Sequence, residues 1–329
     1  MSLFKAEVVK VEIEPHPNAD RLELVRVKGW QCVAQKGQFK TGDLAVYVPV
    51  DAVLPETLVK TLGIEKNYRN RLRTIKLRGC ISQGLASSLS ILDPARGPYK
   101  EGDDVTEQLG VTRYEVPIPV HMSGIVRPEH PDFRRYTDIE NFKNFPAAFG
   151  DDEPVVATEK IHGTSMRAAL FEDGLHVGSH RQSLQDAPEN LYWRAARLLD
   201  LERKLSAGEE VFGEVFGHGI QDLAYGKKPG QVEVRVFDLS RGGRYLDFDD
   251  LEKFCRERGW PMVPVAFRGP WKDAKAHAAG DSLLAPGQVR EGLVVRPAKE
   301  RWSDVLQGRL VLKILNDEYL ARGDRTDFH

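Results

Sequence analysis

The sequence predicts an α+β protein of two domains, and three observations support this prediction. The chain has 329 residues, more than a single domain usually contains. Residues 1–112 carry short strand-like segments separated by glycine and proline turns, a pattern typical of a small β-barrel. From Val155 onward, strand-like segments alternate with helical ones. The composition, 41% hydrophobic and 29% charged, is that of an ordinary globular protein.

The first domain is assigned to residues 1–112. Residues 6–13 alternate apolar and polar side chains, as a half-buried strand does, and a turn-forming segment at 15–20 follows. Further strands are predicted at 22–27, 32–34 and 44–50. We therefore expect a barrel of short strands.

A strongly basic stretch lies between residues 60 and 78. Interleaved apolar residues suit a surface that binds phosphates while its other face packs. A solvated face without a ligand is an equally good interpretation, and both remain open at this point. The basic residues, which have only Glu65 as a counter-charge, are Lys60, Lys66, Arg69, Arg71, Arg73, Lys76 and Arg78.

The second domain is assigned to residues 113–329. It begins with a proline-rich connection, 113–150, that interrupts any long helix. Helices are predicted at 190–205 and 249–258 from the spacing of their apolar residues. Strands rich in Val, Leu and Phe are predicted at 155–158, 211–216, 232–238, 292–296 and 310–315.

The cysteines and the lack of long apolar runs bear on location. Cys32, Cys80 and Cys255 are far apart and lack the spacing of zinc or redox motifs, so we expect buried thiols in a reducing compartment. The N-terminus lacks the apolar core of a signal peptide, and no run is long enough to span a bilayer. We expect a soluble, cytoplasmic protein without a membrane partner.

Four charged residues of the second domain predict its chemistry. Lys160 follows a predicted strand and precedes a glycine turn. Glu214 lies in a strand flanked by glycines, and Glu291 stands at the start of another strand. Lys313 lies within an apolar strand, where a charge is costly unless an anion binds it. Each residue alone could be an ordinary residue without a catalytic role. Brought together in one cleft, the four would hold a nucleoside triphosphate and a metal ion.

Six short motifs follow one another in the second domain. In chain order they are 159–164 (EKIHGT), 179–181 (SHR), 212–217 (FGEVFG), 236–238 (VFD), 290–297 (REGLVVRP) and 312–314 (LKI). They resemble the motifs of the covalent nucleotidyltransferases, the superfamily of ATP-dependent polynucleotide ligases and mRNA capping enzymes. The lysine motif, Lys-Ile-His-Gly-Thr, is similar to that of RNA ligases.

The first domain resembles an OB-fold, and its segment 16–22 (HPNADRL) resembles the opening of tRNA-binding modules. An N-terminal OB-like domain is typical of the Deinococcus- and Naegleria-type RNA ligases. The resemblance implies an OB-like β-barrel followed by an adenylyltransferase (ATP-grasp-like ligase) domain of antiparallel sheets with flanking helices. It also implies a nucleic-acid partner, RNA or RNA/DNA ends in nicked duplexes, and a role in RNA repair. We expect the protein to be a monomer.

The resemblance further implies the reaction. Lys160 would attack ATP to form lysyl-AMP, with Lys313 neutralising the α-phosphate. Glu214 would bind the ribose, and both Glu214 and Glu291 would hold Mg²⁺ or Mn²⁺, hard cations that prefer oxygen ligands. Glu159 would read the adenine, Phe237 would stack on it, and Arg181 would contact the ribose or a phosphate. His162 and Gly163 would complete the ATP site within the nucleophile turn.

Two departures from the family pattern leave alternatives open. Ser165 stands where relatives often have Asn. Leu315 stands where relatives often have a second lysine, so either Lys313 suffices or another basic residue supplies the charge; the candidates are Arg296, Lys299 and Arg309. The alternative functions are an ATP-dependent DNA ligase and a non-catalytic protein that binds tRNA or another nucleic acid.

Overall fold

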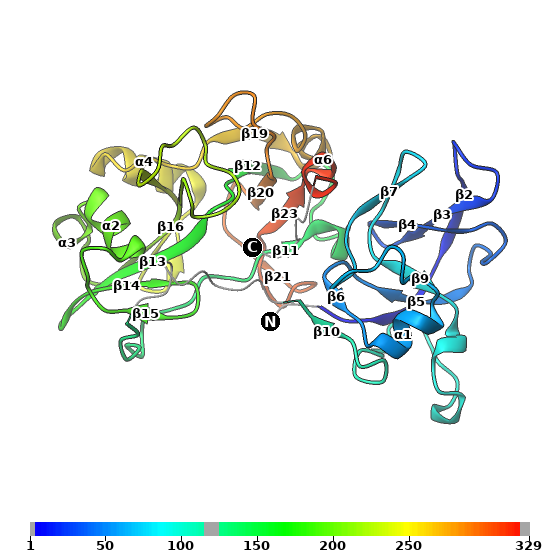
Figure 1. The fold of residues 1–329 in the computed structure, drawn as a ribbon. Helices are drawn as coiled ribbons and strands as arrows, with labels where there is room; N and C mark the ends of the chain where they lie inside the picture. Colours follow the sequence, from blue (N-terminus) through cyan, green and yellow to red (C-terminus); the bar gives the residue numbers. More distant parts are fainter. Residues whose placement is uncertain (1–3, 115–124, 323–329) are drawn as a thin grey trace. The chain divides into compact units, whose positions relative to one another are not determined.

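The computed structural model describes residues 4–114 and 125–322 (Figure 1). The chain divides into two compact units. Of the described residues, unit 1 comprises 4–114, 142–146 and 317–322. Unit 2 comprises 125–141 and 147–316.

Unit 1 is built from short antiparallel strands. One sheet joins β1 (Glu7–Lys10), β5 (Leu44–Val48) and β9 (Leu85–Ser87), and a second joins β2 (Glu12–Pro15), β3 (Leu22–Val27) and β4 (Trp30–Gln35). Two further strand pairs are β6 (Ala52–Val53) with β10 (Thr112–Arg113), and β7 (Ile75–Leu77) with β8 (Cys80–Ser82). The unit also contains the α-helices α1 (Glu56–Thr61) and α6 (Asp317–Leu320).

The strand predicted at 6–13 is broken in two at Val11. The N–H of Val11 donates to the carbonyl of Asp43 at 3.1 Å, and its carbonyl accepts from the N–H of Gly42 at 2.8 Å. Because these bonds tie Val11 to the turn before β5, the chain passes from one sheet to the other at this residue. Val11 is fully buried at this crossing.

Strands β1 and β5 lie between two apolar clusters of unit 1. Val8 packs in one apolar cluster with Val46, whereas Val9 packs in the other with Ala45. Successive side chains of a strand point to opposite faces, so β1 and its partner β5 are buried on both sides.

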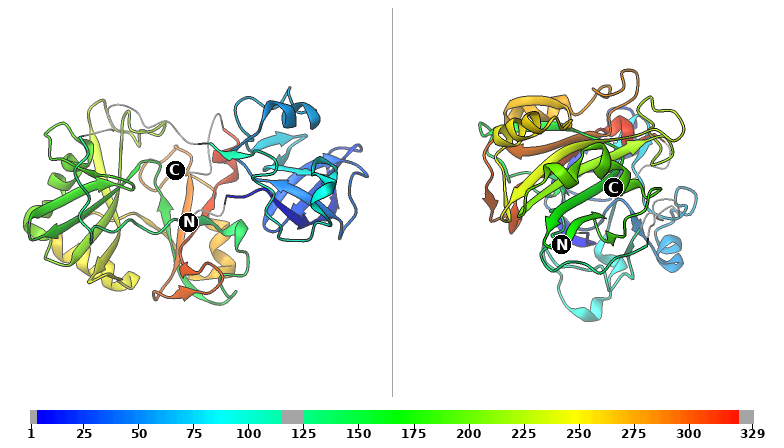
Figure 2. Two further views of the ribbon diagram at one scale, coloured as in Figure 1. Left: turned by 90° about the horizontal axis from the view of Figure 1, so that it is seen from below. Right: turned by 90° about the vertical axis from the view of Figure 1, so that its left-hand side faces the viewer.

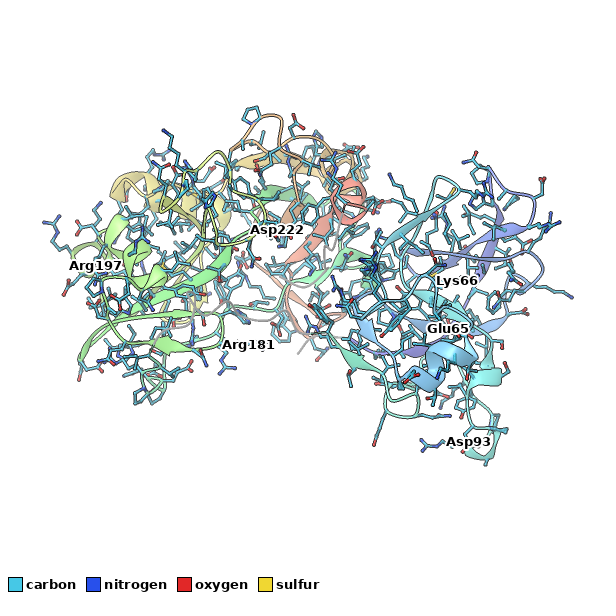
Figure 3. The ribbon with its side chains drawn as sticks, viewed as in Figure 1. Glu65, Lys66, Asp93, Arg181, Arg197 and Asp222 are labelled. Atoms are coloured by element: carbon cyan, nitrogen blue, oxygen red, sulfur yellow. The ribbon has the colours of Figure 1, made fainter. Side chains whose placement is uncertain are left out.

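The basic stretch is only partly a surface. Arg71 is 1% exposed, and its Nε donates to Asp51 at 2.8 Å, while Tyr114 lies against its guanidinium. The expectation that Arg71 binds phosphates is therefore wrong, because its charge is used inside the unit. Lys60 pairs with Glu56 one helical turn away. Lys66, Arg69, Lys76 and Arg78 are exposed, and Lys66 is labelled in Figure 3.

Unit 2 contains two larger sheets (Figures 1 and 2). The five-stranded sheet has the order β11 (Glu140–Asn141), β23 (Leu312–Leu315), β20 (Gly292–Pro297), β12 (Pro154–Lys160) and β19 (Val265–Pro270). The six-stranded sheet has the order β15 (Ser183–Leu184), β14 (Gly174–Ser179), β13 (Thr164–Phe171), β16 (Glu209–Gly217), β17 (Val232–Arg241) and β18 (Arg244–Tyr245). A separate hairpin pairs β21 (Trp302–Ser303) with β22 (Gly308–Arg309).

The helices of unit 2 cover its sheets. Helix α4 (Phe248–Arg258) agrees with the prediction and packs its buried apolar residues into an apolar cluster of the unit. The helix predicted at 190–205 is split into α2 (Leu191–Leu198) and α3 (Leu201–Lys204), because Asp200 adopts a left-handed conformation with φ of 54°. Helix α5 is Trp271–Ala274.

The α+β prediction is confirmed by this architecture. The described sheets are antiparallel except where β11 pairs with β23 in parallel. Among the described residues, no helix is long and apolar enough to cross a membrane.

The buried Arg71–Asp51 pair generates a stability prediction. Arg71→Leu should lower the free energy of unfolding by about 3–5 kcal/mol, because it removes the buried guanidinium that pairs with the Asp51 carboxylate. The exposed Arg69→Leu should change it by less than about 0.5 kcal/mol. Urea unfolding followed by circular dichroism measures both, and equal effects of the two substitutions would contradict the assignment of Arg71 to the interior.

Candidate active site

The turn that carries Lys160 joins the two sheets of unit 2. Strand β12 of the five-stranded sheet ends at Lys160, and β13 of the six-stranded sheet begins at Thr164. A Cβ added to Gly163 would lie 2.3 Å from the carbonyl oxygen of Val215, so this close approach of backbone requires glycine. The buried side chain of Ile161 anchors the turn.

Lys160 contacts a buried carboxylate. Its Nζ lies 2.7 Å from Oε1 of Glu291, which is 1% exposed, and Nδ1 of His162 lies 3.4 Å from the other oxygen. The contact follows from register, because Lys160 pairs with Gly292 on the neighbouring strand and Glu291 immediately precedes that glycine. An adjacent carboxylate favours the ammonium form of the lysine in the free protein.

Glu214 lies on the six-stranded sheet within electrostatic range of both groups. Part of the residue reaches the surface, but burial of its carboxyl group raises the pKa to about 8. The negative Glu291 adds to this shift, whereas Lys160 and the N–H of Gly163 oppose it. Lys160, Glu214 and Glu291 therefore form one coupled set of charges.

Lys313 projects from the same face of the five-stranded sheet as Lys160. Thr158 pairs with Val294, and Val294 pairs with Lys313, so these three side chains share one face. Lys160 lies two residues beyond Thr158 and belongs to that face as well. Lys313 is 4% exposed, in agreement with the expectation of a buried charge in an apolar strand.

Glu159 lies on the opposite face of β12 from Lys160. Its Oε2 accepts a hydrogen bond from the main-chain N–H of Leu283 at 2.7 Å, and burial raises its pKa. The structure does not bring this carboxylate beside Lys160. Its reading of adenine stays a prediction.

Phe237 occupies a β-bulge. Phe212 pairs with Asp238 and Gly213 pairs with Val236, so Phe237 has no partner across the β16–β17 ladder. Bulges turn a side chain out of the regular alternation and are frequent beside active sites. Phe237 is half-buried, with the ring of Tyr136 against it at 4.9 Å.

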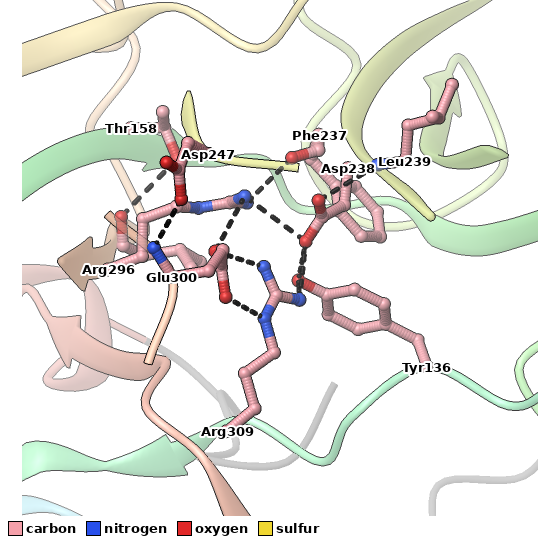
Figure 4. Close-up of polar contacts among 10 residues, drawn as sticks. Tyr136, Thr158, Phe237, Asp238, Leu239, Asp247, Arg296, Glu300 and Arg309 are labelled. Carbon is pink, nitrogen blue, oxygen red and sulfur yellow. Dashed lines mark hydrogen bonds and ion pairs between the residues drawn. The ribbon is translucent and has the colours of Figure 1, made fainter. Parts of the chain in front are cut away.

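A buried ionic cluster lies behind the bulge (Figure 4). Asp238, which is fully buried, receives Arg309 at 2.6 Å, Arg296 at 3.2 Å and the hydroxyl of Tyr136 at 2.6 Å. Burial alone would raise the pKa of Asp238, but the two arginines and the tyrosine outweigh it and lower the pKa. Arg309 also forms two bonds to Glu300.

This cluster bears on which residue could replace the second lysine of the last motif. Arg296 and Arg309 serve Asp238, and Arg296 also donates to the carbonyl of Phe237 at 2.7 Å. Neither arginine is available as a replacement for the second lysine of the last motif. Lys299 is exposed, and Leu315 is buried opposite Gly292.

Two family models match parts of the chain. The RNA ligase family model matches residues 153–315, and an OB-fold domain model matches residues 6–89. The chain belongs to the RNA ligase family.

Solved structures of an RNA ligase from Naegleria gruberi are similar over almost the whole chain. The structure with pyrophosphate has 28% identity and a TM-score of 0.83, covering 98% of this chain and 99% of that one. A mutant with ATP and manganese has 27% identity, the same TM-score, and coverage of 98% and 100%. A mutant with AMP and manganese has 28% identity, a TM-score of 0.83, and coverage of 97% and 99%. No curated protein matches the chain significantly.

Arg181 and Tyr225 are two further positions to be compared with the Lys160 turn. Arg181 lies in an exposed turn after β14, where its N–H faces the hydroxyl of Ser179 (Figure 3). Among the described contacts it has none with Lys160 or Glu291, so its role stays a prediction. No sequence motif predicts Tyr225, whose hydroxyl accepts the N–H of His162 at 2.6 Å. It lies in a connecting segment, 218–231, without a motif or periodic pattern that could have identified it.

The raised pKa of Glu214 predicts a pH-dependent stability. A folded-state pKa above the unfolded value means that stability present below about pH 4.5 is lost as the pH rises toward 8. Glu214→Gln removes this loss, so the Tm of the variant minus that of the unsubstituted protein should be larger at pH 8 than at pH 5. Each kcal/mol of difference in stability corresponds to about 2–4 °C in Tm. Thermal unfolding of the ligand-free protein measures it. Glu172→Gln, at an exposed position of the same unit, is the control, and a Tm difference that does not change with pH would refute the assignment.

Proposed function

We propose that this RNA ligase uses ATP to seal breaks between a 3′-OH and a 5′-phosphate, with RNA on the 3′-OH side and the break in a duplex. The observation that carries the proposal is the position of Lys160. It stands at the junction of two sheets, in contact with the buried Glu291 and in electrostatic range of Glu214. Lys313 shares its face of the five-stranded sheet.

The carboxylates fit a divalent cation. Glu214 and Glu291 supply the oxygen donors that Mg²⁺ and Mn²⁺ prefer, and such ions keep several waters and take further ligands from substrate phosphates. The described residues include no group of three or more His, Cys, Asp or Glu that would form a closed cage. ATP is the co-substrate, and the cation, when bound, withdraws charge from the phosphates and favours the neutral amine of the lysine.

In the first step, Nζ of Lys160 attacks the α-phosphorus of ATP. A P–N bond forms, the bond to the β-phosphate oxygen breaks, and pyrophosphate leaves. The lysine must lose its proton first, and positive charge near Glu291 weakens the ion pair that holds the ammonium form. Lys313 stabilises the negative charge that develops on the phosphate oxygens.

Two further transfers regenerate the enzyme. An oxygen of the 5′-phosphate attacks the AMP phosphorus, so the P–N bond breaks, a P–O–P linkage forms and Lys160 is freed. The 3′-OH then attacks the activated 5′-phosphate, forming the phosphodiester, and AMP leaves. Because each step needs alignment of the attacking and leaving groups, the rigid sheet junction contributes mainly by positioning.

Unit 1 is proposed to bind the nucleic acid. Its exposed cations, Lys66, Arg69, Lys76 and Arg78, support phosphate binding, whereas Arg71 does not take part.

The described cysteines form no disulfide, which fits a reducing compartment such as the cytoplasm. We propose that the protein acts as a monomer with the domains predicted from the sequence, 1–112 and 113–329.

A labelling experiment tests the proposal. Incubation with α-labelled ATP and Mn²⁺ should label the protein, and Lys160→Ala should abolish the label, whereas the exposed Lys299→Ala should keep it. Labelled enzyme should then seal a nick whose 3′-OH strand ends in RNA at least tenfold faster than one that ends in DNA.

The other outcomes decide between the alternatives. Equal sealing of both nicks, or preference for the DNA strand, would favour a DNA ligase. Absence of label at every pH and with either metal would favour a binding protein without ligase activity.

A further inference from the structure

The exposed basic hairpin of unit 1 is held by a second segment far away in the sequence. Strands β7 and β8 are joined by a two-residue turn, Arg78–Gly79, with φ values of 49° and 87°. Positive φ at both residues is the conformation of a tight hairpin turn whose twist matches the strands. Lys76 and Arg78 are exposed on this hairpin, and residues 66–82 contain no Asp or Glu.

The segment that holds the turn contains His16 and Asn18. Nε2 of His16 lies 3.2 Å from the carbonyl of Leu77, and Nδ2 of Asn18 donates to the carbonyl of Arg78 at 3.0 Å. The N–H of Asn18 donates to Nδ1 of His16 at 3.1 Å. Because Nδ1 accepts, a neutral imidazole carries its proton on Nε2, which then donates to Leu77.

The opposite end of the hairpin is also held. Nε2 of Gln31 donates to the carbonyl of Ile81 at 2.6 Å, and the hydroxyl of Ser82 accepts the N–H of Val33 at 3.0 Å. A two-stranded hairpin is marginally stable by itself in water. These bonds to β4 and to the His16 segment therefore order its backbone before any ligand binds.

We propose that residues 16–18 and the hairpin 75–82 form one preordered phosphate-binding element, in which Lys76 and Arg78 contact the backbone of the nicked duplex and His16 and Asn18 position the turn. This inference rests on the proposed ligase function. It gives the His16–Leu22 segment, which resembles tRNA-binding modules, a positioning role rather than direct contact with bases. Backbone contacts of this kind set register without reading sequence.

Salt-dependent binding tests the element. Binding of a nicked duplex is measured by fluorescence anisotropy from about 50 to 200 mM salt. Replacing both Lys76 and Arg78 by Ala should reduce the slope of log K against log salt by about 1.8, which corresponds to two lost phosphate contacts. Asn18→Ala should weaken binding about 3–10-fold and also reduce the slope, although Asn18 carries no charge. Lys40→Ala, exposed elsewhere in unit 1, is the control.

Combination of the substitutions separates positioning from general damage. Asn18→Ala added to the double alanine variant should weaken binding no further, because its effect passes through the same two cations. Additive effects, or an unchanged slope in either variant, would overturn the inference. All variants should form the labelled lysine adduct normally; loss of the adduct in the unsubstituted protein would instead refute the ligase proposal.

Tyr225, in unit 2, carries a second and independent inference. It is 3% exposed and has a φ of 50°, a conformation that costs a bulky residue about 1–3 kcal/mol unless the surroundings impose it. Its hydroxyl accepts the N–H of His162 at 2.6 Å, and its own N–H donates to the side chain of Gln288 at 3.1 Å. It thereby connects the nucleophile turn with the segment that leads into Glu291.

The surroundings keep this hydroxyl protonated. The pKa of Tyr225 is raised far above its ordinary value by burial and by the carboxylates of Glu291, Glu159 and Glu214. The ring packs against Phe216 at 5.1 Å, which holds the hydroxyl in place.

We infer that Tyr225 is a positioning residue for adenylylation. Its hydroxyl fixes the peptide of His162 and thereby the position of Lys160, which precedes this turn. This inference also rests on the proposed function. Misplacement of a nucleophile by a fraction of an ångström is enough to slow a reaction substantially.

Rapid-quench measurement of lysine adenylylation tests the role. Tyr225→Phe, which keeps the ring packing, should lower the maximal rate constant about tenfold and leave the ATP concentration for half-maximal rate within twofold. Tyr245→Phe, which removes the hydroxyl of a half-buried tyrosine on β18, should leave both unchanged. An unchanged rate constant in Tyr225→Phe, or a change confined to ATP affinity, would overturn the inference. Absence of adduct in the unsubstituted protein would instead contradict the proposed function.

Discussion

The ion pair between Lys160 and Glu291 is the interaction on which the rest of the site depends. Its two atoms are 2.7 Å apart, and Glu291 is almost completely buried. A buried charge is tolerated only when a partner is held in good geometry, so both backbones must be fixed. The pairing of Lys160 with Gly292 fixes one side, and the close approach of Gly163 to Val215 fixes the other. The pair therefore couples the proposed nucleophile to the junction of both sheets.

The remaining buried charges of unit 2 fall into two classes. Asp238 is satisfied inside the protein by two arginines and a tyrosine, and its lowered pKa shows that these partners outweigh its desolvation. Glu214 is not compensated in this way, and burial beside Glu291 raises its pKa. Groups left in such an unfavourable state are characteristic of sites that bind a ligand of opposite charge. The structural and the proposed catalytic carboxylates are thus distinguished by their electrostatics.

The same distinction applies to the cations of unit 1. Arg71 is neutralised by Asp51 in the interior, whereas Lys76 and Arg78 project from a hairpin whose main chain is held by hydrogen bonds from His16 and Asn18. These hydrogen bonds order the backbone without placing a carboxylate beside the cations that a phosphate would meet. One basic segment of sequence thus serves two purposes, stabilisation and proposed binding.

The sequence alone determined the two-part α+β organisation, the ligase motifs and the identity of the lysine and carboxylate candidates. These depend on local patterns: alternation within strands, glycine turns and the order of the motifs. It left open which basic residues are accessible, since the periodic pattern around Arg71 does not reveal its pairing with Asp51.

The tertiary structure decided which residues meet. Tyr225 contacts the peptide of His162 across 63 residues of sequence, and Asn18 contacts Arg78 across 60. The ion pair of Lys160 with Glu291 spans 131 residues. Such contacts depend on strand register and sheet order, which no local pattern specifies, because register is set by the packing of the whole sheet.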